Sequence, residues 1–397
     1  MRGVFVRVLS LLSFGLRSTA ARPGPCSIVV LGVAGAAFTL SVLCAVTAGL
    51  RSAIIAAGHA DRVLVLRRGA GSELESGIAP RVREIAAARA EVVRDTGGAP
   101  LVSEEIVRVL DVRTDKAGAT NSLPIRGVGA EFQKVRPELR IVAGRMFTPG
   151  TYELILGRAA ADALGSFTVG SSIEMKGVRW KVVGVFTAAG SSYESEMFTD
   201  GRTIQSFYQA PNMSSVTVRL RDPAAFTSFK SGLESSPDVA VQVARESDYY
   251  AALSTRSSAP LKLVVVLVGG LMGIAAVFLA MNAIHSALSA RTVEIATLRA
   301  LGFEGRVVAA SSVLEVGILA GAGAALGSLV AWIVCRNSAM SLLTGDARLS
   351  QTAFHLQLTS QDLARAIVYA VVIGLLGGLP SAIRAARQPV VEGLRAP

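Results

Sequence analysis

The sequence predicts an α-helical membrane protein with four transmembrane helices and a mixed α+β extracytoplasmic domain inserted between helices 1 and 2. The first observation behind this prediction is the composition: 51% of the 397 residues are hydrophobic, only 17% are charged, and the mean hydropathy is +0.50. Ordinary soluble domains do not have such a composition. The second observation is the order of the chain, in which four apolar runs leave one long polar stretch between the first and the second run.

The first apolar run occupies residues 27–50, and this length suffices because about 20 residues cross a bilayer. Before it, residues 1–26 carry several arginines and place large apolar side chains on one helical stripe, which predicts a cytoplasmic amphipathic lead-in helix. A cleavable signal peptide is the alternative, but the run is longer than a usual signal core. The other spans are predicted at residues 261–284, 307–332 and 364–379.

The polar stretch, residues 51–260, predicts a soluble domain with both helices and strands. Two strand-helix-strand patterns lie near its two ends, and together they predict one α+β subdomain assembled from both ends of the stretch. The first pattern has strands at 62–66 and 105–112 around a helix at 79–90, and the second has strands at 216–220 and 239–243 around a helix at 222–234.

A β-rich segment at residues 141–198 lies between these two patterns and predicts an inserted subdomain. Within it, the alternation of residues 173–186 around Lys176-Gly177 predicts a β-hairpin. Glu194 and Glu196 come shortly after this hairpin. We expect both in a solvated loop rather than in a binding site.

The net charge of +11 and the pI of about 10.1 do not indicate nucleic-acid binding, because the basic excess lies near the apolar runs. Between Arg51 and Lys262 there are 27 basic and 23 acidic residues, whereas the rest of the chain has 13 and 6. Attraction to anionic membrane lipid accounts for this distribution. The arginines at the ends of the spans gather on the side of both termini and of the loop at Arg291. This side is therefore predicted to be cytoplasmic, and residues 51–260 to face outward.

The chain lacks the motifs of the common catalytic sites. It has no G-x-x-x-x-G-K-[ST] phosphate loop, so ATP and Mg²⁺ would have to bind to a separate ATPase subunit. His59, His285 and His355 are far apart in the sequence, which disfavours a metal cluster. The three cysteines lie in or beside apolar runs and predict no disulfide framework. We therefore expect no catalytic residue, no metal site and no cofactor in this chain.

A short charged helix is predicted from Arg291 to Phe303, between the second and third spans. At about 100° per residue, its side chains divide into a mixed charged and apolar face and a face of small apolar residues. We expect such a helix to lie against its own bundle and to offer the mixed face to a partner. The mixed face comprises Arg291, Glu294, Ile295, Leu298, Leu301 and Gly302, and the opposite face Val293, Ala296 and Ala300.

The third span is rich in glycine and contains the one acid that lies well inside a span, Glu315. Small residues let helices approach closely, so we expect this span to be buried in the bundle or at a dimer interface. An intramembrane carboxylate is costly and marks a candidate functional site. Because Arg306 is near in the sequence, a paired structural role for Glu315 is an equal alternative. The glycines form two small-xxx-small spacings and are Gly317, Gly321, Gly323 and Gly327.

Six short strings along the chain carry a family resemblance. The string EIATLRALG begins at Glu294, and PSAIRAARQPVVEGLR follows the last predicted span. The polar stretch contains GRMF, ELILG, WKVVGVF and GSSYESEMF, all between Gly144 and Phe198. Together they resemble the MacB/FtsX-type ABC transporter permeases. The resemblance implies a MacB-like periplasmic core domain at residues 51–260 and an FtsX-like permease domain at residues 261–397.

In this family the loop helix docks on an ATPase subunit, which implies an ATPase-coupling role for its mixed face. The chain is then expected to be the permease subunit of a transporter in the bacterial cytoplasmic (inner) membrane, as a dimer, by default a homodimer, with two ATPase subunits. ATP hydrolysis would move its periplasmic domain, for export or for outer-leaflet extraction of a substrate. By this resemblance Arg291, Glu294 and Arg299 make charge contacts with the ATPase, and Ile295, Leu298 and Leu301, beside Gly302, fill its groove.

Membrane lipid is an expected partner of the four spans, and a periplasmic adaptor or substrate protein is a further candidate partner. Two other functions stay open. One is an FtsX-like, non-transporting transmitter that regulates an envelope enzyme such as a cell-wall hydrolase. The other is a membrane receptor without an ATPase.

Overall fold

The computed structural model describes residues 23–113, 120–164, 167–289, 292–301, 304–336, 338–344 and 350–387. The predicted lead-in helix falls largely on residues outside this set. The chain divides into two compact units. The helix unit comprises Met1–Ala48, Pro260–Ser338 and Leu356–Pro397, and the sheet unit comprises Gly49–Ala259 and Ala339–His355.

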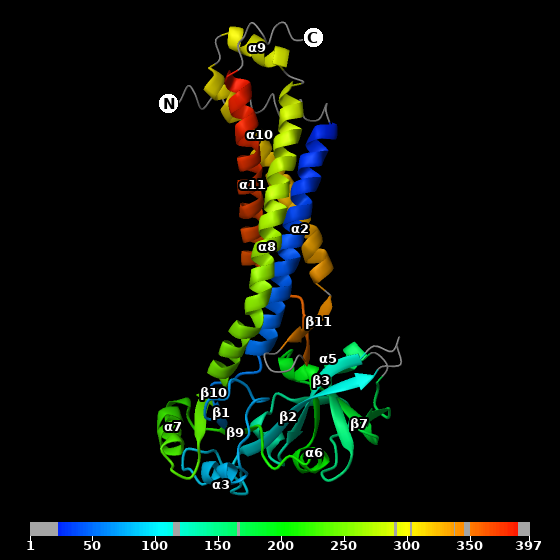
Figure 1. Cartoon of the computed structure of the whole chain (residues 1–397), viewed down its shortest axis with the longest axis vertical. Helices are drawn as coiled ribbons and strands as arrows, with labels where there is room; N and C mark the ends of the chain where they lie inside the picture. The colour runs from blue at the N-terminus through cyan, green and yellow to red at the C-terminus, as the bar shows by residue number, and fades with distance from the viewer. Residues whose placement is uncertain are drawn as a thin grey trace. The chain divides into compact units, whose positions relative to one another are not determined.

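Four helices of the described chain are long and apolar enough to cross a membrane, in agreement with the number of predicted spans. Large apolar side chains stay exposed on these helices, for example Val266 and Leu271 at 68% each. This is expected where the surrounding solvent is lipid, which is as apolar as leucine. The four helices are α2 (Pro23–Ile55), α8 (Glu246–Ser289), α10 (Gly305–Cys335) and α11 (Ser360–Arg387), and the short α9 (Thr292–Ala300) follows α8 (Figure 1).

Two of these helices continue through a proline. α11 passes Pro380 and ends at Arg387, whereas the sequence pattern ends the fourth span at Leu379. α8 contains Pro260. A proline removes one intrahelical hydrogen bond, but membrane helices tolerate this loss because neighbouring groups and local adjustments satisfy the freed carbonyl. For this reason a proline in the sequence does not reliably predict the end of a membrane helix.

Glycines set how closely the helices of the helix unit approach one another. Gly323 and Gly327 face the backbone of α2, and a Cβ added to Gly327 would lie 2.8 Å from the carbonyl carbon of Ala34. The spacing at residues 317–321 faces side chains of α11, and a Cβ on Gly321 would lie 3.9 Å from the nearest of them. The first contact leaves no room for a side chain, whereas the second is an ordinary van der Waals contact.

The sheet unit contains ten strands in one sheet, in the order β10-β1-β9-β2-β3-β8-β5-β7-β4, with β6 paired to β7. The sheet is mixed, because β3 pairs with β8 and β5 with β7 in parallel while the other pairs are antiparallel. The strands are β1 (Arg62–Arg67), β2 (Val102–Arg113), β3 (Thr120–Val128), β4 (Arg140–Gly144), β5 (Glu153–Gly157), β6 (Ser172–Met175), β7 (Val178–Thr187), β8 (Met197–Asp200), β9 (Ser215–Arg219) and β10 (Val241–Arg245).

The first half of the sheet, β10-β1-β9-β2, packs its core against α3 (Arg81–Ala87) and α7 (Phe226–Glu234), which follows the single turn η2 (Pro223–Ala225). β1 pairs with both β9 and β10, so that segments from the two ends of the polar stretch lie side by side. This confirms the predicted subdomain. α3 is shorter than the predicted helix because it begins only after Pro80.

The second half contains the remaining strands together with α5 (Arg158–Leu164) and α6 (Gly201–Tyr208). The predicted hairpin is confirmed: β6 and β7 pair around Lys176 and Gly177, which have φ of 46° and 80°. This half is not a separate insertion, since both halves share β2. The 12-residue β2 pairs with β9 through Val102–Glu105 and with β3 through Glu105–Arg113.

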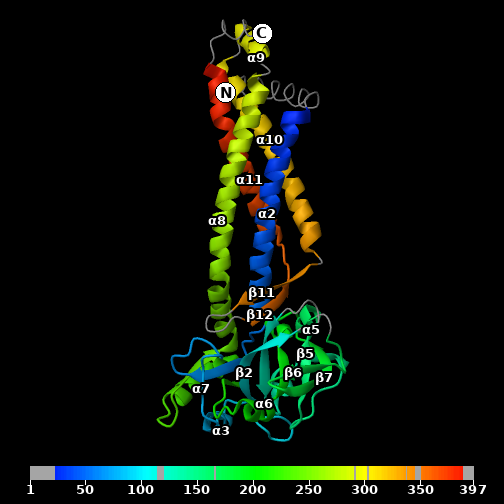
Figure 2. The ribbon, with the colours of Figure 1, turned by 45° about the vertical axis from the view of Figure 1, so that its right-hand side comes forward.

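A second hairpin, β11 (Ala339–Thr344) and β12 (Ser350–His355), lies between α10 and α11 in the chain and belongs to the sheet unit. The sequence pattern predicts only a short loop here. The side chain of Ser195 joins the hairpin to the second half of the sheet: its hydroxyl donates to the carbonyl of Ala353 (3.1 Å) and accepts from the amide of the same residue (2.8 Å). Figure 2 shows the hairpin beside α5.

We expect Gly327→Ala to destabilise the helix unit by about 1–3 kcal/mol, because the added methyl group overpacks the contact with α2. Gly321→Ala is the matched control, and the open contact there should make the change smaller than about 1 kcal/mol. Thermal unfolding of the purified chain in detergent measures both. Equal effects of the two substitutions would contradict the packing described above.

Candidate functional site

The segment predicted to contact an ATPase forms α9 in the helix unit. Arg291 and Gly302 lie outside the described residues, and of Glu294, Ile295 and Leu298 the structure describes only their place on the helix. Of the remaining side chains, Arg299 is half-buried and Leu301 is 73% exposed. Of the face predicted to lie against the bundle, Ala296 is buried, but Val293 is 46% exposed and Ala300 is also exposed, so the structure does not bury this face as a whole. The ATPase-coupling role of this face stays a prediction.

Glu315, the predicted intramembrane acid, lies on α10 and is half-buried. The four glycines of the third span divide between two neighbouring helices, as described above. Among the described residues, the contacts of these four glycines are with α2 and α11.

The sheet unit holds a different cluster, which we call the buried charge network. Its seven residues are all at most 9% exposed, and they come from both halves of the sheet unit and from the first turn of α8. Charged groups are rarely buried to this degree unless they are paired. The members are Arg62, Glu73, Glu105, Arg126, Arg136, Glu196 and Glu246.

Arg126 on β3 is the centre of one part of the network and binds three carboxylates. Its Nη1 lies 2.6 Å from Oε2 of Glu105 and 2.8 Å from Oε1 of Glu73. Its Nε and Nη2 bind the two oxygens of Glu196 at 2.6 and 3.1 Å. Ser215 completes the shell of Glu73 by donating its hydroxyl at 2.7 Å. The guanidinium thus uses its planar fork on bidentate partners, which a lysine could not do.

Glu246 is the centre of the other part of the network. Arg62 donates to Oε2 of Glu246 from its Nε at 2.5 Å, and Arg136, which follows α4 (Phe132–Val135), donates to Oε1. Arg136 also lies 3.1 Å from Oε1 of Glu105. Glu105 therefore connects the two parts, because it binds both Arg126 and Arg136.

Two tyrosines, Tyr193 and Tyr250, lie beside the buried charge network. The ring of Tyr193, on η1 (Ser192–Ser195), has the Cζ atoms of Arg136 and Arg126 at 4.6 and 5.2 Å from its centroid. Such cation–π contacts stabilise a guanidinium that has lost its water. The hydroxyl of Tyr193 lies 2.7 Å from the hydroxyl of Tyr250 on α8.

The pKa values of two carboxyl groups of the network shift in opposite directions. Burial raises the pKa of Glu196 above its ordinary value, although the guanidinium of Arg126 opposes this shift. Burial also disfavours the ionised form of Glu105, but the guanidiniums of Arg136 and Arg126 outweigh it and hold the pKa of Glu105 below its ordinary value. Four buried carboxyl groups face three guanidinium groups, so the ionised form is favoured most where two guanidiniums meet.

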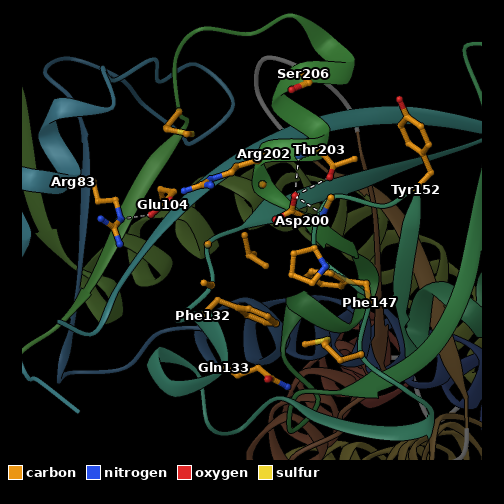
Figure 3. A pocket seen from close by; sticks show the side chains of 18 residues that line it. Arg83, Glu104, Phe132, Gln133, Phe147, Tyr152, Asp200, Arg202, Thr203 and Ser206 are labelled. Atoms are coloured by element: carbon orange, nitrogen blue, oxygen red, sulfur yellow. Dashed lines mark hydrogen bonds and ion pairs between the residues drawn. The ribbon is translucent and has the colours of Figure 1, made fainter. Parts of the chain in front are cut away.

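Both halves of the sheet unit also line a cavity of about 840 Å³ (Figure 3). Phe132 and Phe147 supply apolar surface, and Arg202 supplies an exposed positive charge. On one side, Arg83 is paired with Glu104 at 2.5 Å. The residue after Glu104 is Glu105 of the network, and consecutive residues of a strand point to opposite faces. β2 thus connects the cavity directly to the buried charges.

The expectation that Glu194 and Glu196 lie in a solvated loop is wrong, because both are buried. One oxygen of Glu194 accepts from the amides of Ala188 (2.7 Å) and Gly190 (2.8 Å), and Glu196 binds Arg126. The sequence reasoning missed the whole network. A signal was present, since Arg126 stands inside the apolar run LPIRGV and Arg62 begins the apolar strand RVLVL, and an arginine that is buried in such a strand requires a partner.

Comparison with known proteins gives matches over most of the chain. Residues 27–236 match the family model of the MacB-like periplasmic core domain, and residues 266–390 match that of the FtsX-like permease C-terminal region. None of the curated proteins matches the chain.

Three solved structures are similar to parts of the chain. The periplasmic region of MacB from Actinobacillus actinomycetemcomitans is 14% identical, with 47% of this chain and 89% of that chain covered and a TM-score of 0.38. The extracellular domain of the ABC-type transporter YknZ from Gram-positive bacteria is 16% identical, with 46% and 99% covered and a TM-score of 0.37. A permease domain from Porphyromonas gingivalis is 13% identical, with 46% and 85% covered and a TM-score of 0.29.

Charge removal at Glu105 and at Glu196 should change the stability by different amounts. Glu105→Gln should lower the free energy of unfolding at pH 7 by about 3–5 kcal/mol, because two buried guanidiniums lose a charged partner. Glu196→Gln should cost less, because burial raises the pKa of Glu196 and so reduces the stability that its ionised form contributes. Chemical denaturation of the purified chain in detergent compares the two.

The pH dependence of the free energy of unfolding tests the same assignment of Glu105. The folded pKa of Glu105 lies below its ordinary value of 4.5. Its stabilisation is therefore present above pH 4.5 and is lost as the pH falls through the folded pKa. The difference between wild type and Glu105→Gln should shrink in that window. A larger loss for Glu196→Gln than for Glu105→Gln at pH 7 would contradict the assignment.

Proposed function

Because the chain belongs to the MacB/FtsX-type ABC transporter permeases, we propose that it is the permease subunit of an assembly driven by a separate ATPase. In this proposal, ATP hydrolysis moves the sheet unit, for export or for outer-leaflet extraction of a substrate. The chain itself performs no catalysis, and ATP and Mg²⁺ bind to the ATPase. A second copy of the permease and the membrane lipid are further partners.

The observation that carries the proposal is the continuity of α8. Residues 246–259 of this 44-residue helix belong to the sheet unit, and residues 260–289 belong to the helix unit. At 1.5 Å per residue the helix is about 66 Å long. α9 begins only at Thr292, directly after the end of α8 at Ser289. A force on α9 therefore acts on a helix whose other end is part of the sheet unit.

The mechanism follows from this connection. Closure of two ATPase subunits presses on the α9 helices and changes the tilt of α8. The sheet unit then moves as a rigid body, because Arg62 and Arg136 hold Glu246, the first residue of α8, in place. This is coupling of two sites through one two-state equilibrium. No continuous aqueous pore through the helix unit is required.

In the proposed orientation, α9 and both termini lie in the cytoplasm of a bacterium, and the sheet unit lies outside its inner membrane. The arginines near the ends of the spans support this orientation through the positive-inside rule. The cavity between the two halves of the sheet is the proposed place where cargo or a periplasmic partner meets the moving unit, because both halves line it.

An FtsX-like transmitter is the second candidate, and the match of residues 266–390 to the FtsX-like model favours it. Such a protein uses the same movement to switch an envelope enzyme and transports nothing. A nucleotide-dependent complex with a cell-wall hydrolase, without movement of cargo, would identify this function.

The proposed ATPase contact predicts the effect of reversing one charge on α9. Glu294→Lys should lower the affinity for the ATPase by about tenfold or more, because an unmatched charge in an interface costs several kcal/mol. Glu174→Lys, an equal charge change at an exposed site on β6, is the control and should have no effect. Copurification of the ATPase and the stimulated rate of ATP hydrolysis are measured. Unchanged values for Glu294→Lys would contradict the contact.

The proposed orientation predicts which positions a reagent reaches from outside. Cysteine is introduced at Leu301, next to α9, or at Ser172 on β6, in a variant that lacks the three native cysteines. A membrane-impermeant maleimide should label Ser172→Cys in intact spheroplasts and Leu301→Cys only after lysis. Labelling of Leu301→Cys from outside would overturn the orientation and, with it, the ATPase contact.

A further inference from the structure

Glu246 is the first residue of α8, and its side chain is completely buried. Each carboxylate oxygen binds different parts of the sheet unit. Oε2 accepts from the backbone amide of His59 at 3.2 Å and from Nε of Arg62 at 2.5 Å. Oε1 accepts from Nη1 of Arg136 and from the hydroxyl of Tyr193 at 3.4 Å. One carboxylate therefore holds four donors.

The donors on Oε2 belong to the chain that directly follows α2. α2 ends at Ile55, and its last residues, 49–55, are part of the sheet unit. The loop after α2 also fits closely against the start of α8, since a Cβ on Gly58 would lie 2.8 Å from Cα of Ser247. Glu246 thus ties the loop after α2 and the first residue of β1 to the start of α8. Both α2 and α8 have residues in the helix unit and in the sheet unit.

The donors on Oε1 come from two other segments of the sheet unit. Arg136 follows α4, and its Nη2 also lies 3.1 Å from the hydroxyl of Thr217 on β9, whereas Tyr193 lies on η1 between β7 and β8. The carboxylate consequently joins segments that are far apart in the sequence: the chain that follows α2, the start of α8, the end of α4 and η1.

Stability alone does not account for this arrangement. Well-packed apolar residues often stabilise a fold as much as a buried ion pair or more. A buried carboxylate also fixes the positions of its partners. Each partner must stay at hydrogen-bonding distance, because its departure would leave a buried charge without a partner. Such a contact resists relative displacement of the segments that it joins.

We propose that Glu246 is a positioning residue for force transmission: it clamps α2 and α8 to each other and to the sheet unit, so that both helices move the sheet unit together. The inference rests on the proposed function. It adds a specific residue to that function, together with the partners through which the residue acts.

Glu196 offers a matched comparison inside the same network. It is also a buried carboxyl group, but it binds Arg126 rather than a donor on α2, on α8 or in the loop between α2 and β1. Glu246→Gln and Glu196→Gln make the same chemical change, from a carboxyl group to an amide, at two buried positions of one network. Only the first substitution weakens the clamp.

The test uses the full chain copurified with its ATPase and reconstituted in nanodiscs. Spin labels are attached to cysteines introduced at Ser172 in the sheet unit and at Arg336, at the end of α10, in the variant without native cysteines. Pulsed electron paramagnetic resonance then compares the distances in the nucleotide-free and vanadate-trapped states. We expect a nucleotide-dependent shift in the wild type and in Glu196→Gln, and its loss in Glu246→Gln. Thermal unfolding shows that both variants are folded.

A full shift in a folded Glu246→Gln variant overturns the clamp. Absence of a shift in the wild type overturns the proposed function itself, so the two failures are distinguishable. If Glu246→Gln does not fold, Arg62→Lys decides, because it keeps the positive charge and removes the Nε donor to Glu246. A reduced shift in Arg62→Lys supports the clamp, and a full shift overturns it. Glu246→Asp, which keeps the charge, should restore part of the shift.

Discussion

The sheet unit depends on the contact between buried carboxylates and buried guanidiniums. Removing these charges from water costs several kcal/mol per ion, so each group requires partners at defined positions. Glu105 supplies the link, because it binds Arg126 of one part and Arg136 of the other. A displacement of β2, β3 or the first turn of α8 would leave a charge without a partner. The network therefore makes the two halves of the sheet and the start of α8 a single mechanical body.

A different interaction stabilises the helix unit. In lipid the hydrophobic effect does not drive helices together, and close van der Waals packing of small residues takes its place. Gly323 and Gly327 bring α10 against the backbone of α2, and Gly374 faces Ala320 between α11 and α10. Such contacts allow helices to tilt without breaking an ion pair.

The sequence was sufficient for the spans and for much of the sheet, because both leave periodic patterns. The hairpin around Lys176-Gly177 needs residues that accept positive φ, and the glycine at the turn indicates this in the sequence. Single charges such as Arg62 and Arg126 are different: their partners, Glu246 and Glu196, are far away in the chain, and no local pattern connects them. Glu196 was assigned to solvent for this reason. The sequence pattern ends the fourth span too early, because a proline such as Pro380 is tolerated inside a membrane helix more readily than inside a helix in water.

The central claim is that movement at α9 reaches the sheet unit through α8 and its buried first residue. Electron cryomicroscopy of the permease with its ATPase, without nucleotide and with ATP bound, tests this claim most directly. The account predicts that α8 and the sheet unit move together between the two states, with Glu246 bound to Arg62 and Arg136 in both. A sheet unit that stays fixed relative to the membrane while the ATPase subunits close, or a first turn of α8 that separates from these arginines, would contradict the account.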